Sequence, residues 1–564
     1  MDDPQTRRDV VGRIFAAGAM ASTSASGLGN GGSSGDEPAA RDAVSIGLFA
    51  NARKLRLSHE CTIVRSTGHS IAGNGAAFYV RDSKVNAAHA VSHPRTSFVD
   101  ARGQGFRLTE PLIDVRQVGA IGDGITDDTA ACQEALDIVE ATGGGVLILP
   151  PGEYRITSPL KLPPRVGLRG QGQSSLLRAQ GCDAIAIAGS DSIGPRRISD
   201  FAIQGHGGEH ACAIKCDLDE DSRAQGLVFE NLYISFFGTG VSSRGLWHTS
   251  FRTVSLHQVW HGVLLYGRNV KITIDDCRIT HGGLLRGEGS STGLQVGDGA
   301  SRFRPEDVQV DKSIIYGFNK AIVWRTALFG GVRSCDLDAC TTIGLELVTA
   351  DGGFTFRDNW VQVDGDAVRG IDCTALGYQP QMTNILIANN RINANTASGQ
   401  SWGIMLGNQQ GDVVVDGNSI SGRFSGGIWA QGVNRLNLLN NKIEGTMVVE
   451  RCKGVTITHN HVAGGMTLNA NAGLANGMTF GPQSGRIVGA ITLAPGKVTQ
   501  TATFRSLGLP DLPEGKYGIS LALYIGSAHS RGDIRGHVTR TDIVVEVDHP
   551  LAEQAEVSFQ IDIR

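Results

Sequence analysis

The sequence lacks any run of 18 or more consecutive apolar residues, so nothing in it predicts a transmembrane helix. It also lacks an excess of positive charge, because 51 Lys and Arg residues and 55 Asp and Glu residues give a formal net charge of −4. This balance offers no electrostatic argument for a nucleic-acid partner. Neither a membrane nor a nucleic acid is therefore expected as a partner.

The ten cysteines lack the spacing of a metal site. No Cys-x-x-Cys pair occurs, and the nearest histidines do not complete a zinc-like set. Cys277 and Cys335 occupy a repeat position where small buried residues are expected. We therefore expect free thiols and no metal site.

Charged residues are scarce, at 19% of the chain, whereas 76 of the 564 residues are glycine. Typical domains carry about 25% charged residues and about 7% glycine. This composition favours short strands joined by many tight turns. The length suits one elongated repeat domain with smaller additions at its ends.

A short phrase recurs through residues 229–462: an apolar residue, two polar residues, a small or amide residue, a variable residue and an apolar residue. Ile274–Ile279 and Phe356–Val361 are two examples. The fourth position recurs every 19–36 residues, at Leu232, Val254, Cys277, Ser313, Cys335, Asn359, Asn390, Asn418, Asn441 and Asn460. This period predicts a β-solenoid, in which equivalent residues of successive coils form columns. Buried turn amides can bond to their own backbone and to the next Asn, so we interpret the Asn column as structural.

Residues 113–157 contain a distinctive stretch: Ile113-Asp114-Val115-Arg116, then Gly119 through Thr129, then Gly143 through Ile156. In this stretch the chain resembles the pectate-lyase-like right-handed parallel β-helix superfamily. That group includes polygalacturonase-like glycosidases, mannuronan epimerases, polysaccharide lyases and phage tailspikes. The resemblance implies an all-β protein, a parallel β-helix (solenoid) with an N-terminal capping helix and small terminal β-domains.

Thr126, Asp127 and Asp128 favour the start of a helix that runs to about Ala141 and would cover the open end of the solenoid. We assign Asp123, Asp127 and Asp128 to capping and turns rather than to a metal.

Five segments are expected along the chain. Residues 1–27 resemble a twin-arginine export signal, which implies a periplasmic or extracellular location. Residues 28–43 read as a linker and residues 44–110 as a small β-rich head. The β-helix spans 111–475, and a C-terminal β-domain spans 476–564.

A third strand of each coil is expected to begin with a Gly-apolar phrase, which turns the apolar residue inward and the next residue outward. The outward column is then Ser242, Leu264, Gln295, Val323, Glu346, Asp372, Met405 and Trp429. Glu346 and Asp372 would lie about 4.8 Å apart along the stack and would repel each other unless one held a proton, as in an acid and a base. Their separation would decide between a retaining and an inverting glycosidase. The alternative is that these are ordinary surface acids.

A second set of candidates precedes the same strands: Trp260, His261, His281, Asp338, Asp364, Asp366 and Arg369. Trp260-His261-Gly262-Val263 resembles the Gly-His-Gly-Ile element of polygalacturonase-like glycosidases. That family's Asn-Thr-Asp, Asp-Asp and Arg-Ile-Lys elements are missing from the corresponding places, as is the Tyr-Gly-Phe-Asp-Pro-His element of mannuronan epimerases. We expect Asp338, Asp364 and Asp366 to cluster with Glu346 and Asp372 on two neighbouring coils.

The sequence thus predicts an exported enzyme acting on a polysaccharide or oligosaccharide, a glycoside hydrolase or transglycosylase without a cofactor. Its predicted catalytic residues are Asp338, Glu346 and Asp372. Its predicted substrate contacts are Trp260, His261, Asp364, Asp366, Arg369 and Trp429. One alternative is a uronate lyase or epimerase, in which calcium would neutralise the substrate and Arg325, Arg333 or Arg369 would be the base. Another is a non-catalytic, tailspike-like glycan-binding protein, whose layout implies a homotrimer.

Overall fold

The computed structural model describes most of the chain from residue 43 onward. The described ranges are 43–189, 196–207, 210–283, 290–348, 350–374, 384–408, 411–469, 479–480, 485–493, 499–504, 517–525, 528–530, 534–539, 541–547 and 555–563. The expected export signal and all but the last residue of the linker lie outside these ranges. No helix in the described part of the chain is long and apolar enough to cross a membrane.

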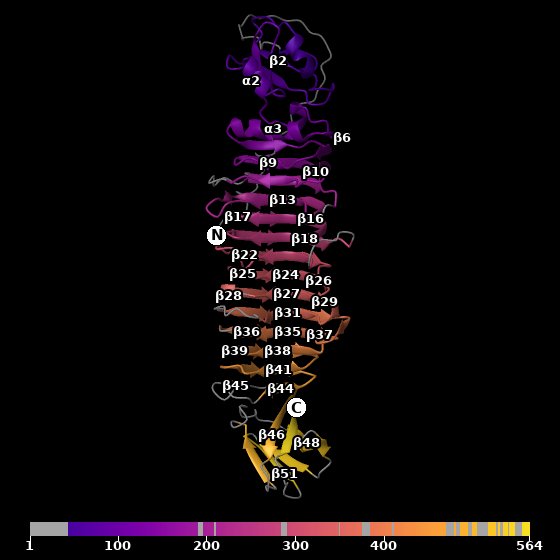
Figure 1. Ribbon diagram of the computed structural model, residues 1–564, viewed down its shortest axis with the longest axis vertical. Coiled ribbons are helices and arrows are strands. Elements are labelled where there is room, and N and C mark those ends of the chain that lie inside the picture. Colours follow the sequence, from indigo (N-terminus) through magenta and orange to yellow (C-terminus); the bar gives the residue numbers. More distant parts are fainter. Residues whose placement is uncertain are drawn as a thin grey trace, which may run out of the picture. The chain divides into compact units, whose positions relative to one another are not determined.

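The central part of the chain is a parallel β-helix, as predicted. Each coil supplies three strands, and each strand pairs in parallel with its equivalent in the next coil. For example, β25 (Ala327–Arg333), β26 (Asp336–Cys340) and β27 (Ile343–Leu347) pair with β28 (Ala350–Arg357), β29 (Trp360–Val363) and β31 (Arg369–Thr374). Figure 1 shows these coils stacked one on the next.

The strands form three stacks, which we call the first, second and third sheets in chain order within a coil. The remaining first-sheet strands are β15 (Leu227–Glu230), β17 (Leu246–Arg252), β19 (Val270–Asp275), β22 (Glu306–Asp311), β32 (Ile385–Ala388), β36 (Val413–Asp416), β39 (Leu436–Leu439), β42 (Thr456–Thr458) and β45 (Thr479–Phe480). The remaining second-sheet strands are β20 (Arg278–His281), β23 (Ile314–Tyr316), β33 (Arg391–Ala394), β37 (Ser419–Gly422), β40 (Lys442–Ile443) and β43 (His461–Val462). The remaining third-sheet strands are β11 (Ile185–Ile187), β13 (Cys212–Asp217), β21 (Thr292–Val296), β24 (Lys320–Trp324), β35 (Trp402–Gly407), β38 (Gly426–Gln431), β41 (Met447–Glu450) and β44 (Met466–Asn469).

Two long strands, β16 (Tyr233–Arg244) and β18 (Ser255–Tyr266), run through both the second and the third sheet. The first coils use β6 (Asp123–Asp127), β7 (Gly145–Ile148), β8 (Gly152–Ile156), β9 (Leu160–Leu162), β10 (Val166–Ala179), β12 (Arg196–Gln204) and β14 (Ala224–Gln225).

The core is built from the inward column predicted for the third sheet. Its members are Val241, Val263, Leu294, Ile322, Leu345, Ile371, Ile404 and Ile428, each at most 3% exposed. They pair with one another in register from coil to coil. Burying apolar side chains at the same position in every coil gives the stack one continuous core.

The amide turns form the predicted ladder. Oδ1 of Asn390 accepts bonds from the backbone N and from Nδ2 of Asn359, each at 3.0 Å. The same pair of hydrogen bonds joins Asn390 to Asn418, Asn418 to Asn441 and Asn441 to Asn460. Because the Asn side chains are at most 2% exposed, each loses water and needs these partners.

Ahead of the coils lie the helix and the head. Helix α3 (Thr129–Ala141) is present, and its Ala131, Ala135 and Val139 are buried. The side chain of Asp128 does not cap it but accepts bonds from the backbone N of Ile121 and Gly122. The head contains β1 (Val44–Ser45), η2 (Phe49–Lys54), β2 (Ile63–Arg65), β3 (Phe78–Arg81), α2 (Ala87–Ser92), β4 (Ser97–Val99), β5 (Gly105–Leu108) and η3 (Val115–Val118).

The chain ends in antiparallel strands. Within the expected C-terminal β-domain lie β46 (Gly485–Leu493), β48 (Tyr517–Ile525), β51 (Asp542–Val547) and β52 (Ala555–Ile563). Three further strands are β47 (Thr499–Thr503), β49 (Ala528–Ser530) and β50 (Ile534–Val538). All ten cysteines are free thiols, as expected, and only Cys182 is not fully buried. The predicted division into head, helix and C-terminal domain stays a prediction.

Asn418→Ala should destabilise the protein by several kcal/mol. It removes the acceptor of two bonds from Asn390 and leaves the carbonyl of Ile387 without its donor, and each buried unsatisfied group costs about 1–3 kcal/mol. Urea denaturation of the full chain measures the loss. The matched control is Asn437→Ala on the outward face of β39, which should change stability by about 0.5 kcal/mol or less. Equal losses in the two variants would contradict the structural role of the ladder.

Candidate active site

The outward column of the third sheet has the register expected from the sequence. Val323 pairs with Glu346, Glu346 with Asp372, and Asp372 with Met405. Trp429 follows in the next coil, paired with Met405. Glu346 and Asp372 are therefore neighbours on adjacent strands.

Each of these two carboxylates has its own cation. Nζ of Lys320, one coil before Glu346, lies 2.8 Å from its Oε2. Nη1 of Arg369 lies 3.0 Å from Oδ2 of Asp372, and the backbone N and Oγ1 of Thr374 donate to Oδ1. The expected pair of bare carboxylates sharing a proton is thus corrected, because Lys320 and Arg369 compensate the two charges separately.

The two carboxylates differ in accessibility. The side chain of Asp372 is 8% exposed and both of its oxygens are bonded, whereas that of Glu346 is 22% exposed. Oε1 of Glu346 has no hydrogen-bond partner among the described residues. Asp372 is therefore a fixed charge, and Glu346 is the carboxylate that a ligand can reach.

A second outward column precedes the first by three residues. It runs through His261, Thr292, Lys320, Ile343, Arg369 and Trp402. Lys320 and Trp402 were missed in the sequence, although shifting the predicted outward column by three residues finds both. The ring of Trp402 covers Gly426 of the next coil, where an added Cβ would lie 2.1 Å from the indole.

Trp402, Met405 and Trp429 together form a partly exposed apolar surface beside Asp372. Indole rings combine a large apolar face with one N–H donor, which suits ligands that have both apolar faces and polar edges. A sugar ring is such a ligand.

Trp260, His261 and His281 lie together, but three coils from Glu346. The rings of Trp260 and His281 are 5.1 Å apart. Trp260 Nε1, His261 Nδ1 and His281 Nε2 are buried without hydrogen-bond partners in the described part of the chain. Burial lowers the pKa of both histidines, helped at His261 by the nearby His281, so neutral rings are favoured.

Asp364 and Asp366 connect neighbouring loops. Oδ1 of Asp364 accepts bonds of 2.9 Å from the backbone N of Asn395 and Thr396. Burial acts to raise the pKa of Asp364, but hydrogen bonds led by Thr396 prevail and lower it. Asp366 accepts a bond from Ser398, beside the pairing of β30 (Gly365–Asp366) with β34 (Ala397–Ser398). Both acids therefore have loop-bridging contacts.

Asp338 and Glu346 lie on successive strands of one coil. Asp338 lies on β26 in the second sheet, and no hydrogen bond or ion pair joins it to Glu346 or Asp372 among the described residues. Ala339, at a positive φ of 53°, sits where the pairing with β29 shifts register, and such bulges re-aim side chains. Asp338 is thus on the second sheet and Glu346 on the third, and the clustering of the five acids stays a prediction.

Asp336, two residues before Asp338, was missed in the sequence. Its Oδ1 is buried without a hydrogen-bond partner, and burial, followed by the charge of Asp338, raises its pKa. Its neighbours in register are Ile314 and Trp360, which are 39% and 37% exposed. Their apolar side chains keep water from this carboxyl.

Arg333, one candidate lyase base, is engaged elsewhere. Its Nε and Nη2 donate to the two oxygens of Asp311 at 2.8 and 3.1 Å.

No group of three or more His, Cys, Asp or Glu side chains in the described ranges is arranged to hold a metal ion.

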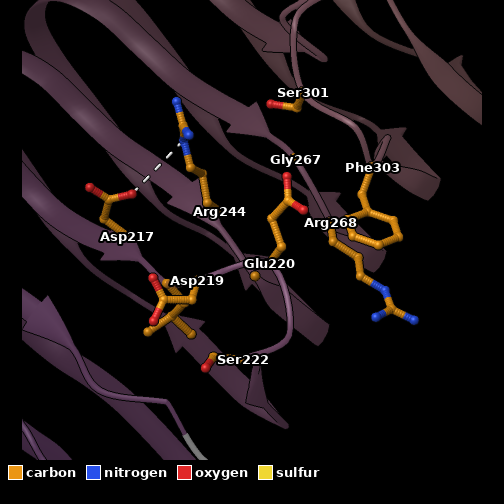
Figure 2. A pocket seen from close by; sticks show the side chains of 11 residues that line it. Asp217, Asp219, Glu220, Ser222, Arg244, Gly267, Arg268, Ser301 and Phe303 are labelled. Atoms are coloured by element: carbon orange, nitrogen blue, oxygen red, sulfur yellow. Dashed lines mark ion pairs between the residues drawn. The ribbon is translucent and has the colours of Figure 1, made fainter.

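A pocket of about 300 Å³ lies where loops of four successive coils meet, after β13, β16, β18 and β21 (Figure 2). Its lining includes Asp217, Asp219, Glu220, Arg244, Arg268 and Phe303. The sequence did not indicate it, because its residues fall in loops between the repeat phrases.

A family model described as rhamnogalacturonase A/epimerase, pectate lyase-like, matches residues 112–197. At the level of the superfamily, the chain is pectate-lyase-like. The match falls on the stretch that carried the resemblance in the sequence.

This pectate-lyase-like chain is similar to the tail spike protein of Shigella phage Sf6, with 28% identity over 274 residues, 45% of this chain and 43% of the phage protein. It is 54% identical over 44 residues to mannuronan C5-epimerase AlgE1 of Azotobacter vinelandii, 8% of this chain and 3% of the epimerase. It thus spans less than half the length of either relative. Among solved structures, a tailspike protein gp49 from Acinetobacter baumannii bacteriophage Fri1, a capsular polysaccharide depolymerase, aligns with a TM-score of 0.42 and 10% identity over 92% of this chain and 98% of that one.

Asp336→Asn should stabilise the protein at pH 7 and lose that advantage as the pH falls towards 4. A carboxyl whose pKa is raised by folding holds its proton more tightly in the folded state, so its ionisation costs stability above the unfolded pKa of about 3.9. Urea midpoints across this range measure the effect. Asp311→Asn, which breaks an ion pair, should instead destabilise at pH 7. A pH-independent effect of Asp336→Asn would contradict the raised pKa.

Proposed function

We propose that this chain is a polysaccharide- or oligosaccharide-acting enzyme whose substrate lies along the outward face of the third sheet. The observation that carries the proposal is the adjacency of Glu346 and Asp372, each held by its own cation, beside the indoles of Trp402 and Trp429. The pectate-lyase-like family match supports a glycan as the substrate class.

The spacing of the coils suits an extended glycan. From His261 to Trp429 the outward face crosses six coil intervals, about 29 Å at about 4.8 Å per interval. One interval is similar to the length of one sugar unit, so successive sugars could contact successive coils. Such a chain would lie parallel to the stack.

The contacts assign different roles to the two acids. Glu346, whose Oε1 has no hydrogen-bond partner among the described residues, would take up a proton and donate it to the glycosidic oxygen as the glycosidic bond breaks. Water would then attack the sugar ring and return a proton to Glu346, while Lys320 would hold the Glu346 side chain in place. Asp372, whose oxygens accept bonds from Arg369 and Thr374, would stabilise positive charge on the sugar ring in the transition state.

The remaining expectations belong to the same proposal. Export through residues 1–27 would place the enzyme where extracellular glycans are, and the homotrimer stays a prediction. Trp260 and His261 would contact the far end of a bound glycan through the partly exposed parts of their rings.

Glu346→Gln and Asp372→Asn should each lower turnover by about 100-fold or more, because positioned acid–base groups contribute about 10²–10⁴-fold. The measurement is release of reducing ends from a panel of bacterial, plant and algal glycans. Asp311→Asn, another acid of an Arg ion pair on the β-helix surface, should keep turnover within about twofold.

Three results would redirect the assignment. Wild-type turnover in both variants would remove these acids from catalysis. An unsaturated, ultraviolet-absorbing product, lost on adding a chelator, would favour the calcium-dependent lyase. Retention of a glycan by the wild-type protein without any product would favour the binding protein.

Trp429→Ala should weaken substrate binding, seen as a rise in KM of about 3–10-fold with a smaller change in kcat. The loss corresponds to the roughly 0.5–1.5 kcal/mol that a well-placed aromatic contact contributes. Trp360→Ala is the matched control, since Trp360 is exposed on the second sheet, away from the proposed substrate path. If both variants raised KM equally, the substrate would not follow the third sheet alone.

A further inference from the structure

The pocket between the loops after β13, β16, β18 and β21 contains a preorganised cation. The guanidinium of Arg268 lies 4.9 Å from the ring centre of Trp247 and 5.1 Å from that of Phe303. Figure 2 shows Arg268 beside Phe303 in the lining of the pocket. Two aromatic neighbours restrict the side chain, so little further entropy is lost when it binds a ligand.

Arg268 has no acidic partner among the described residues. Other arginines on the β-helix do: Arg244 lies 3.9 Å from Asp217, and Arg369 lies 3.0 Å from Asp372. Arg268 is half-buried, and its N–H donors make no hydrogen bond in the described part of the chain. A planar guanidinium with free donors favours a carboxylate, which it can bind through two parallel bonds.

The rest of the lining favours a ligand that also carries hydroxyl groups. Asp219 and Glu220 are exposed acids with no ion pair among the described residues, so they can accept bonds from hydroxyls. The same two charges repel a simple polyanion. The volume of about 300 Å³ lies at the small end of ligand sites, enough for one or two sugar units.

We propose that this pocket binds a carboxylated sugar, with Arg268 receiving the carboxylate and Asp219 and Glu220 receiving hydroxyls. The inference rests on the proposed function in taking a glycan as the ligand and deepens it by naming uronate-type units as part of that glycan. The pocket is separate from the acid pair, since Arg268 follows β18 and Glu346 lies three coils further along.

Calorimetry with monosaccharides tests the site, because a monosaccharide has no glycosidic bond to cleave. D-glucuronate should bind the full-length protein at least 10-fold more tightly than D-glucose or the methyl ester of glucuronic acid. Arg268→Lys should weaken glucuronate binding about 10-fold, because the ammonium loses the planar, stacked fork. Arg391→Lys, an exposed arginine on the second sheet, should leave it unchanged.

Glu220→Gln gives an independent test, since Glu220 is an exposed loop residue whose replacement should leave the fold intact. It should weaken glucuronate binding about 3–10-fold. Equal affinity for glucose and glucuronate, or for glucuronate and acetate, would overturn the proposal, as would unchanged binding in both pocket variants. Glucuronate binding that survives in Glu346→Gln would separate this site from the proposed catalysis, whichever way the turnover test falls.

Discussion

Parallel hydrogen bonding between the backbones of successive coils is the constraint on which the rest of this structure depends. A slip of one residue would turn the apolar column outward, so the pairing of Leu345 with Ile371 fixes the register of the strands that carry them. The Asn ladder adds to this constraint, because a slip would separate side chains that bond across every coil from Asn359 to Asn460. The same register decides which outward side chains become neighbours.

Some of these outward side chains have an ion-pair partner of opposite charge and others have none, and this difference bears on function. Glu346 and Asp372 are held by Lys320 and Arg369, which gives two fixed carboxylates side by side. Asp336 has no such cation, and burial raises its pKa. Arg268 is the opposite case, a restrained cation without an acid. An unpaired, partly buried charge raises the free energy of the folded protein, so a ligand of opposite charge that compensates it binds favourably.

Much of the scaffold could be predicted because its rules are local and repeat along the chain. The Gly-apolar phrases gave both columns of the third sheet, and the adjacency of Glu346 and Asp372 followed from them. The sequence did not show that Asp338 lies on the second sheet, because eight residues of separation do not reveal where the chain turns onto the third sheet before Glu346. The bonds of Asp364 to Asn395 and Thr396 could not be predicted, because that loop belongs to the next coil.

The sequence by itself determined the β-helix, its inward columns, its amide turns and its free thiols. Each of these depends on spacing along one coil and on the chemistry of the residue at that position. Only the tertiary structure decided which side chains of different coils meet, such as Lys320 with Glu346 or Arg268 with Phe303. The physical reason is that side-chain reach and loop path vary between coils, while the backbone pairing that sets the repeat does not.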